Sequence, residues 1–252
     1  MHCCTVAEAV MDKQTTLRVF SYNIRHAEGV DTRIDLERIA EVISQSDPDL
    51  VALQEVDKHC ERSGDRDLAA ELGRSLDMRH RFGKCMDYQG GEYGMAILSR
   101  LRIADTVRHP LPDGAEPRCA LEVQVRAERT PFPISFVCIH NDAADSTIGV
   151  MQVKALLNAL DRRTNPIILA GDFNAESTDR SMQLLREAQW NVLEKEGEPT
   201  WPADRPRREI DFIVLRNFPE IIIDHGVIDE RVASDHRPVY ATISFEAVSQ
   251  GA

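Results

Sequence analysis

Six apolar stretches of this sequence carry a carboxylate, amide or imidazole side chain at or near one end, and such groups can bind metal ions and transfer protons. In chain order these side chains are Asn23, Glu55, His140, Asp172 with Asn174, Asp211, and Asp235 with His236. Carboxylate and amide oxygens suit Mg²⁺ or Mn²⁺, whereas zinc sites use Cys and several His. The set therefore predicts a magnesium or manganese site rather than a zinc site.

The two histidines of this set are suited to phosphoryl chemistry. His140 and His236 can hydrogen-bond phosphoryl oxygens or transfer protons near neutral pH. Clustered carboxylates repel one another, and a divalent ion that bridges them to a phosphate removes the repulsion and polarises the phosphorus. Each fragment alone is more often a turn, a cap or a solvated carboxylate. All of them together in one chain indicate a metal-dependent site for phosphate esters.

The apolar stretches alternate with amphipathic segments, which is typical of α/β proteins. Stretches rich in Val, Ile and Phe predict strands at Leu17–Tyr22, Leu50–Leu53, Met95–Ser99, Ala120–Val125, Ile134–Ile139, Pro166–Ala170, Ile210–Leu215, Ile221–Asp224 and Pro238–Phe245. Apolar residues at three- and four-residue spacing predict helices at Asp35–Gln45, Asp67–Leu76, Ser146–Leu160 and Asp179–Gln189. Because ligand sites form at strand ends in sheets covered by helices, the polar residues are expected to share one site.

The composition indicates one globular domain. The chain has 252 residues, of which 42% are hydrophobic and 29% charged, and no linker or repeat divides it. We expect residues 1–16 to be a loosely ordered lead-in and residues 17–252 to form the single domain. No apolar run approaches the roughly 20 residues of a transmembrane helix. We therefore expect no membrane insertion.

The location of the protein is inferred from its first residues and its cysteines. The sequence starts without the basic and apolar regions of a signal peptide. None of the six cysteines forms a C-x-x-C pair. We therefore expect a cytoplasmic protein whose cysteines are reduced thiols.

The net charge of −12 bears on the choice of substrate. An acidic protein repels polyanions, and nucleic-acid-binding proteins usually have a basic face. A small phosphoester is therefore favoured over DNA or RNA, although a local basic patch or bound divalent ions could offset the net charge. The sequence gives no indication of an oligomeric state.

The motifs together resemble those of the endonuclease/exonuclease/phosphatase superfamily of metal-dependent phosphoesterases. The matching segments are Tyr22-Asn23-Ile24, Leu53-Gln54-Glu55, Tyr93–Ser99, His140, Gly171-Asp172-Phe173-Asn174, Ile210-Asp211-Phe212 and Ser234-Asp235-His236. The resemblance extends from about Arg18 to Phe245. It implies an α/β fold of four layers, a sandwich in which two mixed β-sheets pack face to face and are flanked by helices. It also implies an active site at one edge of both sheets.

The resemblance implies a role for each matching residue. One or two Mg²⁺ or Mn²⁺ ions would be held by Asn23, Glu55, Asp172, Asn174, Asp235 and His236. The catalytic residues would be His140, Asp172, Asn174, Asp211 and His236. Both histidines would contact the scissile phosphate, Asp211 would orient His236, and Asp172 or His236 would activate the attacking water. The leaving oxygen would be protonated by His140 or by a water on the metal.

Basic and aromatic residues near these motifs are candidates for substrate binding. Arg25 and His26 come directly after Asn23, and arginine binds phosphate through two parallel hydrogen bonds. The full candidate set is Arg25, His26, Arg62, Tyr93, Arg118 and Trp201. The segment from Tyr88 to Gly94 is expected to be a loop that borders the site, because its glycines allow close backbone approach.

Several functions are compatible with these motifs. The sequence favours a metal-dependent phosphodiesterase that acts on a small organic phosphodiester or a phospholipid head group. The alternatives are a DNA or RNA nuclease of the same fold and a phosphatase of sugar or inositol phosphates. A catalytically silent binding module is a remote alternative, because every key polar group of the motifs is present.

Overall fold

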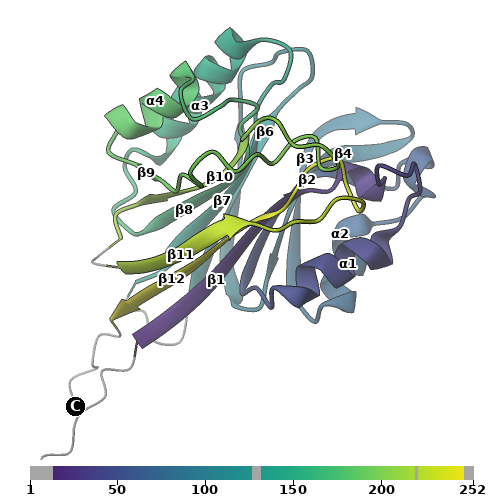
Figure 1. The fold of residues 1–252 in the computed structure, drawn as a ribbon, viewed down its shortest axis with the longest axis horizontal. Coiled ribbons are helices and arrows are strands. Elements are labelled where there is room, and N and C mark those ends of the chain that lie inside the picture. Colours follow the sequence, from purple (N-terminus) through teal and green to yellow (C-terminus); the bar gives the residue numbers. More distant parts are fainter. Residues whose placement is uncertain (1–13, 127–131, 219–220, 247–252) are drawn as a thin grey trace, which may run out of the picture.

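The computed structural model describes residues 14–126, 132–218 and 221–246, and these residues form four layers (Figure 1). In spatial order, one sheet contains β11 (Ile221–Val227), β12 (Val239–Glu246), β1 (Gln14–Asn23), β2 (Leu50–Lys58), β4 (Gly91–Ser99) and β3 (Arg79–Tyr88). The other contains β5 (Arg102–Pro110), β6 (Cys119–Arg126), β7 (Ile134–His140), β8 (Ile167–Asp172), β10 (Asp211–Arg216) and β9 (Asn191–Val192).

Helices cover the outer face of each sheet. The first sheet is covered by α1 (Leu36–Gln45) and α2 (Leu68–Ser75), and the second by α3 (Ser146–Leu160) and α4 (Arg180–Glu187) (Figure 1). Three of the four helices begin at an aspartate whose side chain accepts a hydrogen bond from a backbone N–H of the first turn. The predicted four-layer sandwich of two mixed sheets is thus confirmed.

Three apolar layers hold the sandwich together. Side chains such as Leu17, Ile97 and Phe136 fill the space between the two sheets and are almost fully buried. A second cluster packs the first sheet against α1 and α2, and a third packs the second sheet against α3 and α4. Burial of apolar surface on both faces explains why the central strands are nearly continuous apolar runs.

Strand directions bring the polar motifs to one edge of the sandwich. β1 and β2 are parallel neighbours, so Asn23 pairs with Gln54 where both strands approach the site. β7 and β8 are also parallel, and His140 pairs with Asp172 at their carboxyl ends. β10 runs antiparallel to β8, so its first residue, Asp211, pairs with Asp172.

Three strands were not predicted from the sequence. β3 and β5 each lie at or next to the edge of the sandwich, and their many exposed or half-buried positions weaken the apolar pattern that signals a strand. β9 has only two residues. The predicted lead-in also ends earlier than expected, because β1 begins at Gln14. Residues 1–13 lie outside the described part of the chain.

The expected loop from Tyr88 to Gly94 is instead a β-hairpin. β3 ends at Tyr88 and β4 begins at Gly91, and the two residues between them, Gln89 and Gly90, both have positive φ angles, 43° and 79°. Such angles are typical of the two-residue turns whose twist matches that of paired strands. The prediction of a loop was wrong because the glycines serve this turn.

The expectation that all cysteines are reduced is also wrong. Cys85 of β3 and Cys119 of β6 form a disulfide that joins the two sheets, while Cys60 and Cys138 are free and buried. The two residues are 34 positions apart, and the sequence alone gave no indication of this pairing. Disulfides persist mainly in oxidising compartments, so the cysteines no longer support the expectation of a cytoplasmic protein. Within the described ranges, no helix is both long and apolar enough to cross a membrane.

Removal of this disulfide should destabilise the fold. Replacing both Cys85 and Cys119 with Ala is expected to lower the free energy of unfolding by about 2–4 kcal/mol, because the unfolded chain gains freedom when the loop opens. Urea denaturation measures the change. Dithiothreitol should destabilise the wild type by a similar amount and leave the double variant unaffected. A wild-type transition that dithiothreitol does not shift would contradict this expectation.

Candidate active site

Glu55 reaches the site edge through an irregularity in β2. The pairing of β2 with β4 shifts register between Leu53 and Val56, and Glu55 has a φ of 56°. Positive φ is uncommon outside glycine, and a bulge of this kind redirects a side chain within a strand. As a result the Glu55 carboxylate faces Asn23, whose Nδ2 donates to Oε1 of Glu55 at 3.0 Å.

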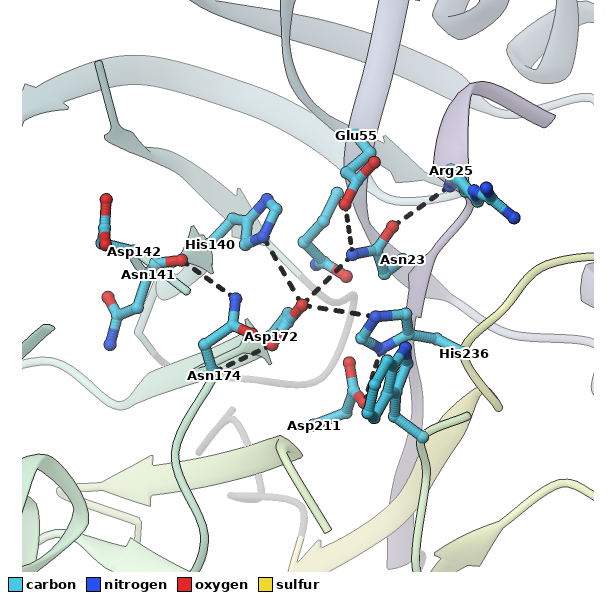
Figure 2. Close-up of polar contacts among 12 residues, drawn as sticks. Asn23, Arg25, Glu55, His140, Asn141, Asp142, Asp172, Asn174, Asp211 and His236 are labelled. Atoms are coloured by element: carbon cyan, nitrogen blue, oxygen red, sulfur yellow. Dashed lines mark hydrogen bonds and ion pairs between the residues drawn. The ribbon is translucent and has the colours of Figure 1, made fainter. Parts of the chain in front are cut away.

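Asp172 is the centre of the site (Figure 2). Its Oδ2 accepts a hydrogen bond from Nδ2 of Asn23 at 3.1 Å and lies 3.5 Å from Nε2 of His140 and 3.7 Å from Nε2 of His236. Its Oδ1 accepts a hydrogen bond from the backbone N–H of Asn174 at 2.8 Å. Burial raises the pKa of Asp172 to about 7, an effect that His236 opposes and Asp211 reinforces. This single carboxylate therefore connects residues from both sheets.

His236 forms a pair with Asp211. Its Nδ1 lies 3.0 Å from Oδ2 of Asp211, and both side chains are buried. Burial lowers the pKa of His236, but the carboxylates of Asp211 and Asp172 outweigh that effect and raise it to about 10. Both ring nitrogens thus face carboxylate oxygens: Nδ1 hydrogen-bonds to Asp211, and Nε2 lies 3.7 Å from Asp172. Two neighbouring carboxylates favour the protonated ring.

Lys195 contacts the backbone of Asp211, the partner of His236. Its Nζ donates to the carbonyl oxygen of Asp211 at 2.9 Å and forms an ion pair with Glu209 at 2.8 Å, and it lies 4.2 Å from the centre of the Phe212 ring. The Thr200 hydroxyl accepts from the backbone N–H of Asp211. Lys195 was not predicted from the sequence, because a lysine between two glutamates is typical of a solvated surface segment.

His140 is held on its other side by Arg118. Nη1 of Arg118 lies 3.0 Å from Nδ1 of His140 and 3.5 Å from the Tyr93 hydroxyl. Burial lowers the pKa of His140 well below its ordinary value, and the positive charges of Arg118 and His236 lower it further. Arg118 and Tyr93 were predicted to bind substrate, and the structure instead gives Arg118 a contact with a candidate catalytic residue.

Two further predicted ligands have partners outside the central cluster. Nδ2 of Asn174 donates to the carbonyl oxygen of Asn141 at 3.1 Å. Asp235 is half-buried, and its Oδ2 accepts from the indole N–H of Trp201 at 3.4 Å. Trp201 therefore holds a carboxylate in place through its N–H, a contact that its sequence context did not predict.

The remaining basic candidates are held by nearby acidic groups. Arg25 forms an ion pair with Glu28 at 3.3 Å, and Nε2 of His26 lies 3.5 Å from the same carboxylate, in a short turn where both residues have positive φ. Arg62 donates two hydrogen bonds of 2.8 Å to the buried Asp57 and lies 4.5 Å from the centre of the Tyr88 ring. Nε and Nη2 of Arg62 thus already donate to Asp57, which leaves fewer N–H donors of its guanidinium for a substrate.

The donor set fits a hard divalent cation. Ligand atoms of Asp172, Asp211 and His236 lie within 4.8 Å of one another, and all three residues are buried. Glu55 joins this group through Asn23, whose Nδ2 bridges Glu55 and Asp172. In this arrangement Oδ1 of Asn23 accepts from the backbone N–H of Arg25, so the amide nitrogen and not the predicted ligand oxygen faces the carboxylates. Buried carboxylates are costly without a compensating cation, which a divalent ion supplies.

The chain is similar to known proteins. A model described as the Endonuclease/Exonuclease/phosphatase family matches residues 20–236 of the chain, which confirms the resemblance that the motifs indicate.

Solved structures are similar over almost the whole chain. An endonuclease/exonuclease/phosphatase family protein from Bacteroides thetaiotaomicron is 20% identical with a TM-score of 0.76, over 93% of this chain and 99% of that chain. A mannosyl-6-phosphatase from the same species is 20% identical with a TM-score of 0.72, over 91% and 100%. Truncated TDP2 from Caenorhabditis elegans is 16% identical with a TM-score of 0.72, over 90% and 97%. At these identities the similarity establishes the shared fold.

Proposed function

The chain belongs to the Endonuclease/Exonuclease/phosphatase family, whose members are hydrolases of phosphoesters, and we propose that it is a divalent-metal-dependent phosphodiesterase for small organic phosphodiesters. The observation that carries this proposal is the position of Asp172, whose carboxylate lies between His140, His236 and the Asn23–Glu55 pair. Such a cluster offers an acceptor for a proton of water and several donors for phosphoryl oxygens. These are the requirements for attack of water on phosphorus.

Asp172, His236 and His140 have different roles in the proposed reaction. Asp172 accepts the proton of the attacking water, because the carboxylates that face both nitrogens of His236 favour the protonated ring. His236 donates a hydrogen bond to a phosphoryl oxygen through Nε2, while Asp211 holds its Nδ1 proton at 3.0 Å. His140 donates from the opposite side. Together these donors stabilise the charge that develops in the transition state.

Mg²⁺ or Mn²⁺ would be held by oxygens of Glu55, Asp172 and Asp235, with Asn23 and Asn174 at its border, and His236 would lie beside it. When bound, the ion supplies Lewis-acid polarisation of the phosphoryl group and offsets the negative charge of the carboxylates. The half-buried Glu55 and Asp235 would leave part of the ion open to substrate. Asn23 would need to turn its amide for Oδ1 to become a ligand.

The net charge of −12 supports a small substrate, because a protein of this net charge repels extended polyanions. A phosphomonoester of a sugar is the second candidate. It is favoured by the similarity in fold to a mannosyl-6-phosphatase, a protein named for activity on such a compound. Nucleic acid remains the partner that the charge disfavours.

Removal of divalent ions should abolish the activity. Hydrolysis of bis-p-nitrophenyl phosphate is expected with added Mg²⁺ or Mn²⁺ and should fall by at least about 10²-fold in EDTA, because the ion's charge stabilisation is lost. Excess Mg²⁺ should restore the rate. Parallel assays with p-nitrophenyl phosphate, mannose 6-phosphate, a phosphocholine diester and plasmid DNA compare the candidate substrates. Full activity in EDTA would contradict metal dependence, and dominant cleavage of plasmid would overturn the choice of a small substrate.

A further inference from the structure

His140 is held between two partners at its two ring nitrogens. Nη1 of Arg118 lies 3.0 Å from Nδ1, and Oδ2 of Asp172 lies 3.5 Å from Nε2 (Figure 2 shows the contact with Asp172). The side chains of His140 and Arg118 are only 5% and 8% exposed, so water does not readily replace either partner. The orientation of the ring is therefore set by the protein itself.

The chemistry of the two partners decides which nitrogen carries the proton. A guanidinium group has five N–H donors and no acceptor, so Nδ1 of His140 accepts the hydrogen bond from Arg118. A neutral imidazole has one accepting nitrogen and one N–H. The proton of His140 therefore resides on Nε2, where it faces the carboxylate of Asp172 and the space into which a phosphoryl oxygen would come.

Most N–H donors of Arg118 are engaged or enclosed within the protein. Its Nη1 contacts His140 and the Tyr93 hydroxyl, and its Nη2 forms an ion pair with Glu116 at 3.1 Å. Its Nε is buried and has no hydrogen-bond partner. Because these groups are engaged or enclosed, Arg118 acts through His140 rather than on the substrate, which differs from the role expected from the sequence.

We propose that Arg118 is a positioning residue that locks His140 in the Nε2–H tautomer, so that His140 donates a hydrogen bond to a phosphoryl oxygen but does not protonate the leaving group. A ring that lost its Nε2 proton while Nδ1 accepted from Arg118 would become an anion. When the P–O bond breaks, the leaving oxygen keeps the bonding electron pair and takes a proton from solvent water, which becomes hydroxide. The tautomer is a property of the chain alone, and only its consequence for catalysis rests on the proposed function.

The tautomer can be measured directly by NMR on the full chain with ¹⁵N-labelled histidine. The ring signals of His140 are identified by their loss in His140→Gln. In the wild type we expect a protonated Nε2 and an unprotonated Nδ1. Arg118→Met should release Nδ1 and add a population in which Nδ1 is protonated, whereas Arg118→Lys keeps a donor and should retain the wild-type pattern.

A matched control removes another partly buried arginine that forms an ion pair. Arg163 binds the buried Glu122 near the opposite end of β7 and β8, at 3.1 Å. Arg163→Met should leave the ring signals of His140 unchanged. A proton on Nδ1 in the wild type, or ring signals that do not change in Arg118→Met, would overturn the proposal. These measurements need no substrate, so they remain decisive even where the proposed activity fails.

Kinetics then test the role in catalysis. Arg118→Met should lower kcat by about 10–100-fold with little change in KM, as expected when the partner of a site histidine is lost. A higher KM at unchanged kcat would instead show that Arg118 binds substrate. His140→Gln should lower the rates of hydrolysis of bis-p-nitrophenyl phosphate and diphenyl phosphate by the same factor. A much larger loss with diphenyl phosphate, whose leaving group is the stronger base, would show that His140 is the proton donor and overturn the proposal.

Discussion

Asp172→Asn is expected to lower kcat/KM for bis-p-nitrophenyl phosphate by about 10²–10³, the loss typical for removal of one charged group that acts in the transition state. The substitution keeps the shape of the side chain and removes its charge. It removes the acceptor for the proton of water. It also weakens the electrostatic contacts of Oδ2 with Nε2 of His140 and Nε2 of His236, at 3.5 and 3.7 Å. No other carboxylate among the described residues lies between these two rings.

The same substitution should preserve the fold. A buried carboxylate is costly, and burial already raises the pKa of Asp172 to about 7, so a neutral amide at this position is expected to leave the free energy of unfolding unchanged or higher. Urea denaturation and steady-state kinetics on the same preparation separate the two effects. Activity within about ten-fold of the wild type would exclude Asp172 as a central catalytic group.

Glu122 provides a matched control for a buried carboxylate away from the site. It is 1% exposed and binds His109, Ser135 and Arg163 at 2.9, 2.7 and 3.1 Å. Glu122→Gln should lower the free energy of unfolding by about 1–3 kcal/mol, because charged partners lose their acceptor. It should leave kcat/KM of the folded enzyme unchanged. The two variants are therefore expected to affect stability and activity in opposite ways.

His236 and Asp211 are expected to act as one unit in a double-mutant cycle. His236→Gln should lower kcat by about 10²–10³, because Nε2 no longer presents a charged donor to the phosphoryl group. Asp211→Asn should lower kcat by about 10–100-fold, because the imidazole loses the carboxylate that lies 3.0 Å from Nδ1 and orients the ring. The double variant should be no slower than His236→Gln alone, since Asp211 acts through the ring.

Rate measurements at saturating substrate on the wild type, the two single variants and the double variant test this coupling. If the separate losses of His236→Gln and Asp211→Asn multiplied in the double variant, Asp211 would have an independent role, such as binding the metal. Its ligand atoms lie within 4.8 Å of those of Asp172 and His236, so that outcome has a structural basis. An Asp211→Asn enzyme as active as the wild type would exclude the pairing as a source of catalysis.

The sequence predicted the site where local signals sufficed. Asn23, His140 and Asp172 stand at the ends of buried parallel strands, and such strands appear in a sequence as apolar runs bounded by polar residues. Parallel pairing of β7 and β8 places His140 beside Asp172. The packing of the two sheets face to face then brings Asn23, from the other sheet, to the same edge. The resemblance of the motifs to the family then implied two sheets packed face to face with helices outside.

Other parts could not be predicted, because they depend on contacts between distant segments. Lys195 becomes a buried support for Asp211 only when β10 forms, and the Cys85–Cys119 bond needs both sheets in place. Arg62 looked like a phosphate-binding residue until the fold placed it on Asp57. Arg118 likewise gained its partner, His140, from a different strand. At Arg62 and Arg118, charge and residue type suggested contacts with substrate, and packing determined the actual neighbours.

The pairing of β1 with β12 has a consequence for how the protein is made. β1 lies between β2 and β12, and Ser234, which hydrogen-bonds the carbonyl oxygen of Asn23, is 211 residues away from it. During synthesis β1 leaves the ribosome early and can pair with β2, but its other edge stays open until nearly the whole domain has been translated. An unpaired apolar edge invites association with other chains. The nascent protein therefore depends on protection of this edge for most of the time that the ribosome is extending it.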